Sequence, residues 1–154
     1  MEKTNVMRIL DQKKIAYTPY EYSPDITEGT LIADILGEPR ERVFKTLVTE
    51  APNRHYYVFV IPVEQTLDLK AAARVVGEKS VAMLKQKELL SLTGYIHGGC
   101  SPVGMKKLFK TVFHVTARDF DYIYVSAGRV GKQVCVNAKD IAALIKAEFA
   151  EIIV

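Results

Sequence analysis

Two runs of β-branched and aromatic residues, separated by a short polar turn, constrain the fold of this chain most strongly. Residues 43–48 (VFKTLV) and 56–61 (YYVFVI) have the composition typical of strands. The short spacing between them favours an antiparallel hairpin. Residues 122–126 and 133–136 repeat this arrangement. We therefore expect a sheet built mainly from antiparallel pairs, and not a doubly wound parallel sheet.

The other apolar patterns predict helices around this sheet. We expect helices over the N-terminal segment that carries Val6, Ile9, Leu10 and Ile15, over 30–36 ended by Gly37, over 69–76 between Asp68 and Gly77, over 86–92 closed by Gly94, and over 138–149. Further extended segments are expected at 17–22, where Pro19 indicates an edge strand, at 81–84 and at 111–116. The pattern predicts one domain, 1–154, of the α/β (α+β) class, with a mixed, mostly antiparallel sheet flanked by helices.

Composition excludes several classes of protein. The 154 residues are 49% hydrophobic and 25% charged, which is typical of a soluble globular domain. No apolar run is long enough to span a bilayer, and no signal peptide opens the chain, so no membrane partner is expected. Two cysteines, Cys100 and Cys135, are too few for a disulfide framework, which favours the cytoplasm. A net charge of +3 permits contact with a nucleic-acid end but predicts no broad DNA-binding face.

Four glycines and a proline are concentrated in residues 93–107 (TGYIHGGCSPVGMKK). Glycine lets a ligand approach the backbone N–H groups closely, so this loop could hold an oxygen or a phosphate, although an ordinary irregular turn has the same composition.

Lys45 stands in a run otherwise suited to burial. It is either a solvent-facing strand residue or an ammonium at the mouth of an apolar pocket. Thr46 would point the opposite way and offer only its backbone.

Side chains that could act as a nucleophile or bind a metal are few. His97 and Cys100 could form a nucleophilic dyad, but three positions apart on an extended segment they would face opposite sides. A metal site would need Cys135 with His55 or His114, and the short spacing typical of metal ligands is missing. We therefore expect no metal and interpret Cys100 as a small packing residue.

Several segments together resemble the YbaK/EbsC family. They are Phe44-Lys45-Thr46-Leu47, Leu67-Asp68-Leu69-Lys70, the glycine-rich loop with its Ser101-Pro102 step, and Tyr122-Ile123-Tyr124-Val125-Ser126 followed by Gly128-Arg129 and Gly131. The resemblance covers nearly the whole chain. That family is the free-standing relative of the editing domain of bacterial prolyl-tRNA synthetases. The resemblance implies a mixed, largely antiparallel α/β domain that needs no cofactor and removes cysteine from mischarged tRNA(Pro), with Cys-tRNA(Cys) as a further substrate.

The resemblance also assigns site residues. It implies that Lys45 is the essential lysine and that Gly98 contacts the aminoacyl carbonyl with Gly99 beside it. The substrate-binding residues that it implies are Tyr20, Thr46, Ser101, Pro102 and Ser126. Two positions depart from the family pattern: Cys100 stands where an apolar residue is usual, and Gln133 where an acidic residue is frequent.

An aminoacyl-tRNA is an activated ester, so positioning and oxyanion stabilisation suffice without a strong enzymatic nucleophile. We expect the N–H groups of Gly98 and Gly99 to face the ester carbonyl oxygen, and Lys45 to neutralise developing charge or orient the terminal adenosine. In the family, the substrate's own thiol is the implied attacking group. Two alternatives stay open: an Ala-tRNA(Pro) deacylase that uses an ordered water, and a non-catalytic module that binds aminoacyl ends or a synthetase. The modest charge predicts weak affinity for tRNA alone, with prolyl-tRNA synthetase as the implied partner.

Overall fold

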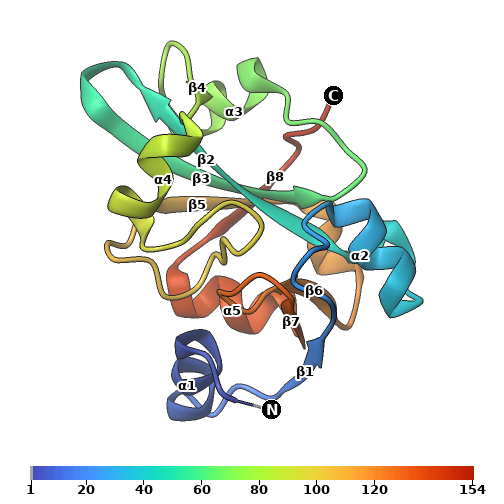
Figure 1. The fold of residues 1–154 in the computed structure, drawn as a ribbon. Coiled ribbons are helices and arrows are strands. Elements are labelled where there is room, and N and C mark those ends of the chain that lie inside the picture. Colours follow the sequence, from blue (N-terminus) through green and yellow to red (C-terminus); the bar gives the residue numbers. More distant parts are fainter. Residues whose placement is uncertain (1) are drawn as a thin grey trace.

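Two β-sheets pack around helix α5 (Ala138–Ile145) in the computed structural model, which describes residues 2–154 (Figure 1). The larger sheet has the order β4-β2-β3-β5-β8, formed by Ala82–Met83, Phe44–Ala51, His55–Pro62, Lys110–His114 and Glu148–Ala150. The smaller sheet has the order β1-β7-β6, formed by Tyr17–Glu21, Lys132–Val136 and Ile123–Ser126. An isolated bridge between Val43 and Tyr124 joins the two sheets.

Both predicted hairpins are confirmed. β2 pairs antiparallel with β3, with Lys45 opposite Ile61, and β6 pairs antiparallel with β7, with Ser126 opposite Gln133. β1 lies at an edge of the smaller sheet, where Pro19 withholds no needed ladder hydrogen bond. β5 pairs in parallel with both β3 and β8, which makes the larger sheet mixed. The expected α+β class with a mixed, mostly antiparallel sheet is thus confirmed.

The other helices are α1 (Asn5–Gln12), α2 (Gly29–Leu36), α3 (Leu69–Val76) and α4 (Gln86–Thr93), with short 3₁₀ turns at Arg40–Arg42, Pro52–Arg54 and Val115–Asp119. The Asp68 carboxylate caps α3 by accepting from the N–H groups of Lys70 and Ala71, both at 3.1 Å. Gly37, Gly77 and Gly94 end α2, α3 and α4 in the left-handed conformation, as the sequence predicts. No helix within residues 2–154 is long and apolar enough to cross a membrane.

The C-terminal prediction was wrong in part. The helix expected over 138–149 ends at Ile145, where Lys146 takes a left-handed φ of 57°. Residues Glu148–Ala150 instead form β8, because β5 offers them a free parallel edge. The strand expected over 111–116 likewise ends at His114 and continues as a 3₁₀ turn. Ile15 lies beyond α1 but still packs against the main core.

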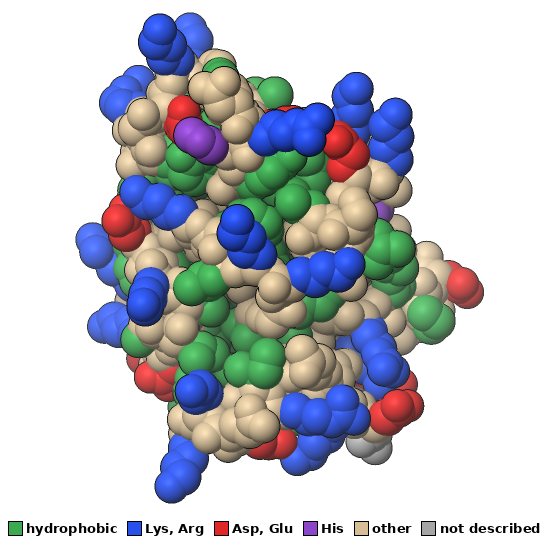
Figure 2. All heavy atoms as spheres, turned by 90° about the vertical axis from the view of Figure 1, so that its left-hand side faces the viewer, with side chains coloured by type: hydrophobic (Ala, Val, Ile, Leu, Met, Phe, Trp, Pro, Cys, Tyr) green, Lys and Arg blue, Asp and Glu red, His purple; other side chains and the backbone are tan. Residues whose placement is uncertain are grey.

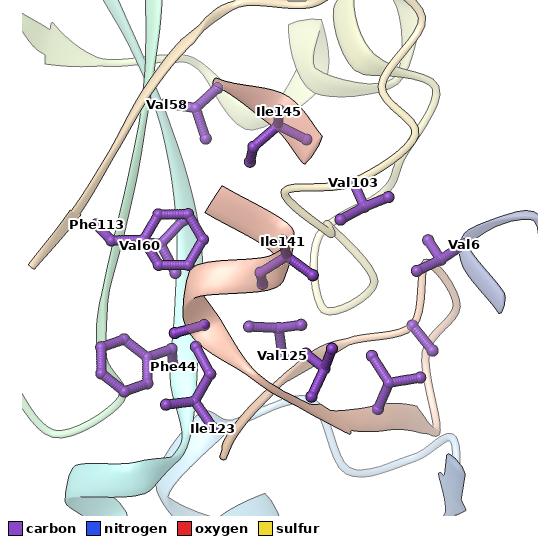
Figure 3. Packing of buried hydrophobic residues seen from close by; sticks show 14 of the residues in the cluster. Val6, Phe44, Val58, Val60, Val103, Phe113, Ile123, Val125, Ile141 and Ile145 are labelled. Atoms are coloured by element: carbon purple, nitrogen blue, oxygen red, sulfur yellow. The ribbon is translucent and has the colours of Figure 1, made fainter. Parts of the chain in front are cut away.

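The main core lies between the two sheets and α5. Figure 3 shows Val60 and Phe113 of the larger sheet beside Ile141 of α5, with Val125 of the smaller sheet next to Ile141 and Ile123 next to Phe44. All of these side chains except Phe44 are 0% exposed. Complete burial of side chains of this size stabilises a fold by about 1.5–3 kcal/mol each. This core holds the ends of β2, β6 and β7 in fixed positions beside the cavity described next.

Candidate functional site

A cavity of about 410 Å³ opens between the N-terminal end of α2, the first half of β2, helix α4, the glycine-rich loop and the adjoining ends of β6 and β7. Four of the predicted site residues lie in its wall: Lys45, Thr46, Gly98 and Ser126. The structure therefore brings together a lysine, a loop glycine and a serine from three distant parts of the chain. Further residues in the wall are Thr27, Glu28, Thr30, Leu89, His97, Cys100 and Gln133.

Lys45 supplies the cavity with a positive charge that has no carboxylate partner. The side chain is half-buried, and burial lowers the pKa of its ammonium group. Within residues 2–154, no carboxylate lies within 4.0 Å of its Nζ. An ammonium that is partly desolvated and not neutralised by the protein favours an anionic ligand, or a group that becomes anionic during a reaction.

Thr46 presents polar groups at an open strand edge. The Val48 carbonyl accepts from the Leu84 N–H at 3.0 Å, so Val48 directs its backbone away from β3. Thr46, two residues earlier, directs its own N–H and C=O toward the same edge. β4 pairs only with Thr49 and Glu50 and leaves this part of the edge free. The Thr46 Oγ1 is also buried without a hydrogen-bond partner in the described part of the chain.

Gly98 and Gly99 have different roles in the loop. Gly98 has φ +86°, and a Cβ added there would lie 3.1 Å from the Thr27 side chain, so glycine is required. Its N–H donates to no other backbone or side-chain group within residues 2–154. The Gly99 N–H, in contrast, donates to the Ile96 carbonyl at 3.0 Å, and Gly99 packs tightly against the backbone of Val130. Of the two amides expected to face an ester, only that of Gly98 is thus left for a ligand.

The smaller sheet closes the cavity with Ser126 and Gln133, which lie opposite each other on β6 and β7. The Ser126 Oγ accepts from the Gly128 N–H at 3.1 Å, which fixes the side chain. Gln133 is 4% exposed, and its Nε2 donates to the Tyr22 hydroxyl at 3.5 Å. Its Oε1 is buried without a partner. A buried acceptor without a partner is costly, so this oxygen is suited to a donor from a ligand.

Comparison with known proteins decides the family. The family model of the aminoacyl-tRNA editing domain matches residues 24–144, a range that contains every residue of the cavity wall. The chain belongs to the aminoacyl-tRNA editing domain family. It is 44% identical over 153 residues to EbsC of Enterococcus faecalis, named as a candidate Cys-tRNA(Pro)/Cys-tRNA(Cys) deacylase, covering 98% of this chain and 93% of that protein.

More distant relatives agree with this assignment. Over 98 residues the chain is 26% identical to the proline–tRNA ligase of Fervidobacterium nodosum, which is 64% of this chain but 17% of the ligase. The fold matches the crystal structure of a candidate trans-editing enzyme for prolyl-tRNA synthetase, with a TM-score of 0.85, 20% identity and coverage of 100% and 99% of the two chains. It also matches a hypothetical protein, with a TM-score of 0.90, 20% identity and coverage of 98% and 100%. These structures support the fold.

In this editing domain, His97 and Cys100 lie on the same side of the loop. Both line the cavity, contrary to the expectation for an extended segment, because the chain turns at Gly98. Cys100 packs against the main core, as predicted, and burial raises the pKa of its thiol to about 12. A thiol that stays protonated at neutral pH is a weak nucleophile. No group of three His, Cys, Asp or Glu side chains in the described residues could hold a metal ion.

Three predicted substrate-binding residues of the editing domain lie outside the cavity wall. Tyr20 shares a sheet face with Gln133, but its ring packs against that of Tyr124 at 5.4 Å. Ser101 is buried, and its Oγ accepts from the Val103 N–H at 3.2 Å, which stabilises the loop. Pro102 borders a separate hollow of about 70 Å³. Their direct contact with a substrate stays a prediction.

Sequence reasoning did not place the N-terminal end of α2 in the site. Thr27, Glu28 and Thr30 lie in the cavity wall, and Thr27 adjoins Gly98 of the glycine-rich loop. The only local indication was a polar run just before an apolar helix, and such runs are common at helix starts. The contact between Gly98 and Thr27, which are 71 positions apart, comes from the tertiary fold.

Proposed function

We propose that this protein is a trans-editing deacylase that removes cysteine from mischarged Cys-tRNA(Pro), with Cys-tRNA(Cys) as a second substrate. The observation that carries the proposal is a cavity with an unneutralised Lys45, unpartnered polar atoms on Thr46 and Gln133, and, among residues 2–154, no nucleophile hydrogen-bonded to a base. Membership of the editing-domain family and the 44% identity to EbsC support the same assignment.

The cavity wall offers separate groups for separate parts of an aminoacyl ester. In this proposal the N–H of Gly98, which lines the cavity, donates to the ester carbonyl oxygen, where negative charge develops in the transition state. The Lys45 ammonium stabilises that charge or a phosphate of the terminal nucleotide. The Gln133 Oε1 and the Thr46 backbone carbonyl can accept from the α-ammonium group of the amino acid.

The attacking group comes from the substrate in this proposal, because neither Ser126 nor Cys100 is activated by a neighbouring base. The cysteine sulfur attacks its own carbonyl carbon, so that a C–S bond forms and the C–O bond to the ribose breaks. The thiol proton passes to the ribose oxygen, which leaves as the free hydroxyl of the tRNA. The resulting four-membered thiolactone is then hydrolysed by water to free cysteine.

The macromolecular partner in this proposal is the acceptor end of tRNA, and prolyl-tRNA synthetase is the protein partner. A deacylase that acts between release and use of a mischarged tRNA must work where translation occurs. We therefore propose a cytoplasmic location.

The test is a deacylation panel on tRNA(Pro) charged with cysteine, alanine or serine. Lys45→Ala is expected to lower Cys-tRNA(Pro) deacylation about 10²–10³-fold, because charge stabilisation in the transition state is lost. Lys139→Ala, which removes an exposed lysine on α5, is the matched control and should leave the rate unchanged. An unchanged rate in Lys45→Ala would contradict the role of this lysine.

The amino acid dependence separates the alternatives. Faster turnover of the cysteine ester than of the alanine and serine esters supports attack by the substrate thiol. Equal turnover of all three excludes that route, and a preference for alanine indicates attack by an ordered water. Retained binding of charged tRNA without turnover of any ester would show a binding module instead of an enzyme.

A further inference from the structure

Positive charge is concentrated in one segment of the chain. Residues 79–110 contain six lysines and one acidic residue, Glu88, a net charge of +5. The rest of the chain has 15 basic and 17 acidic residues, a net charge of −2. The overall charge of +3 therefore averages a basic segment with a slightly acidic remainder.

Four of these lysines are free to bind a partner. Lys79, Lys85, Lys87 and Lys107 are exposed, and none forms an ion pair or a side-chain hydrogen bond within residues 2–154. The other two lysines have local partners. The Lys106 Nζ donates to the Ser91 carbonyl at 3.4 Å, and the Lys110 Nζ lies 3.9 Å from a Glu148 carboxylate oxygen.

The same segment also contributes residues to the cavity wall. Leu89 of α4 and both Gly98 and Cys100 of the loop lie in the cavity wall, while the lysines of the segment are exposed and lie outside that wall. Figure 2 shows the side of the molecule where α4 lies in Figure 1: blue lysine and arginine side chains far outnumber red acidic ones and surround green apolar surface. The exposed apolar residues of this segment are Met83, Leu90, Ile96 and Leu108.

We infer that this surface, formed by residues 79–110, binds the phosphate backbone of the tRNA acceptor arm while the aminoacylated 3′ end enters the cavity. The inference rests on the deacylase function proposed above. Lysines without acidic partners bind phosphates and release counterions, which gives affinity without sequence specificity. The exposed aliphatic side chains between them can contact riboses and unstacked bases of the single-stranded end.

RNA fits this surface better than an acidic protein does. The ester must enter a cavity whose wall includes α4 and the glycine-rich loop, and in this inference the nucleotides that precede it along the strand pass over these two elements. The N-terminal end of α4 has no side-chain cap and carries Lys85 and Lys87 beside a single acidic residue, Glu88, so this end of the helix has a net positive charge. The expectation of weak tRNA affinity was drawn from the overall charge of +3, whereas residues 79–110 alone carry +5.

The test compares Lys85→Ala/Lys87→Ala/Lys107→Ala with the charge-matched control Lys13→Ala/Lys70→Ala/Lys139→Ala, which removes three exposed lysines outside the segment. Affinity for uncharged tRNA(Pro) is measured at several salt concentrations. The first variant should bind at least tenfold more weakly, and the slope of log affinity against log salt should fall by about 2–3, about 1 for each phosphate that the variant no longer neutralises. The control should match the wild type in both quantities.

Kinetics with two substrates separate this surface from the catalytic site. For Cys-tRNA(Pro), the first variant should show a KM raised at least tenfold with kcat nearly unchanged. For 3′-O-cysteinyl-adenosine, which has no tRNA body, its turnover should equal that of the wild type. A loss of turnover on the adenosine ester would overturn the assignment of these lysines to the tRNA backbone.

The outcomes for the two proposals are distinguishable. If the wild type deacylates neither substrate while the lysine variant loses tRNA affinity, the surface is supported and the deacylase function fails. If the variant keeps the affinity and salt slope of the wild type, the surface inference is overturned even when deacylation is observed. A variant that binds tRNA normally but loses affinity for prolyl-tRNA synthetase would show a protein-binding face and would also overturn it.

Discussion

The two faces of the smaller sheet are built from the same strands but have different chemistry. On one face, Ile123, Val125 and Val134 are completely buried in the main core and carry no polar side-chain atom. On the other face, the alternate residues include Ser126 and Gln133, which are also nearly buried yet line the cavity. Because successive side chains on a strand point to opposite faces, one short strand can serve stability and a site at once.

The exposed fraction of a side chain does not show whether its polar atoms have hydrogen-bond partners. The side chains of the core face pack against other apolar side chains of the protein and need no ligand to fill their surroundings. The cavity face leaves the Gln133 Oε1 without a partner. A buried acceptor of this kind lowers stability unless a ligand supplies the missing donor. Substitution of Ile123 on the core face and of Gln133 on the cavity face should therefore have opposite effects on stability and activity.

The largest effect is expected on the core face. Ile123→Ala should lower the free energy of unfolding by about 2–5 kcal/mol, because it leaves a cavity among completely packed side chains. Urea denaturation measures this loss, with Tyr122→Ala as the control, since Tyr122 is the adjacent residue and is 48% exposed. Deacylation per folded molecule should stay close to the wild-type rate. A stable Ile123→Ala protein that has lost activity would contradict the division between the faces.

Gln133→Leu should have the opposite pair of effects. Replacing this amide, whose buried Oε1 has no partner and whose Nε2 makes only a long bond to Tyr22, with an apolar side chain should raise the free energy of unfolding by about 1 kcal/mol. It should also lower kcat/KM for Cys-tRNA(Pro) about tenfold, because the substrate ammonium loses a charge-assisted acceptor. Gln133→Glu is the matched control and should retain most of the activity. A variant that loses both stability and activity would show that Gln133 is a structural residue.

Ser126→Ala should lower the free energy of unfolding by less than Ile123→Ala does. It removes the acceptor of the Gly128 N–H, which should cost about 0.5–1.5 kcal/mol. Ser23→Ala breaks the equivalent bond from the Asp25 N–H at an exposed position and should cost less. Thermal denaturation of both variants compares the two bonds. Equal losses would mean that burial on the cavity face adds nothing to this interaction.

The smallest effect is expected at Cys100, which belongs to the cavity wall but not to the proposed chemistry. Burial raises its pKa to about 12, so the thiolate fraction at pH 7.5 is smaller than in free cysteine and grows as the pH increases. Alkylation by iodoacetamide should therefore be slower than that of glutathione at pH 7.5 and should accelerate at higher pH. Cys100→Ala should keep deacylation within about twofold of wild type. A large loss of activity would make this thiol a catalytic candidate again.

Local sequence patterns predicted most elements because their causes are local. The apolar runs around Lys45 and Val58 form the β2–β3 hairpin, and Asp68 with Gly77 bounds α3 at the predicted residues. The C-terminal segment was harder, since residues 148–150 suit a helix by themselves. They become a strand only because β5 lies alongside with free hydrogen-bonding groups.

The candidate site, like the fold, was predicted in part from the sequence. Lys45, Gly98 and Ser126 were singled out and do line one cavity. The different hydrogen bonding of the Gly98 and Gly99 N–H groups was not predictable, because it depends on which carbonyl the turn brings close to each N–H. The concentration of lysines in residues 79–110 is visible in the sequence, but which of them lack partners depends on the tertiary structure.

Neighbouring residues and short-range periodicity were enough to predict which segments form strands and helices, where most of them end, and which family the motifs resemble. Three-dimensional packing was needed to establish which polar groups remain without partners and which side chains share one cavity. Such properties depend on residues far apart in the chain, such as Gly98 and Thr27, whose contact exists only once both sheets have packed around α5.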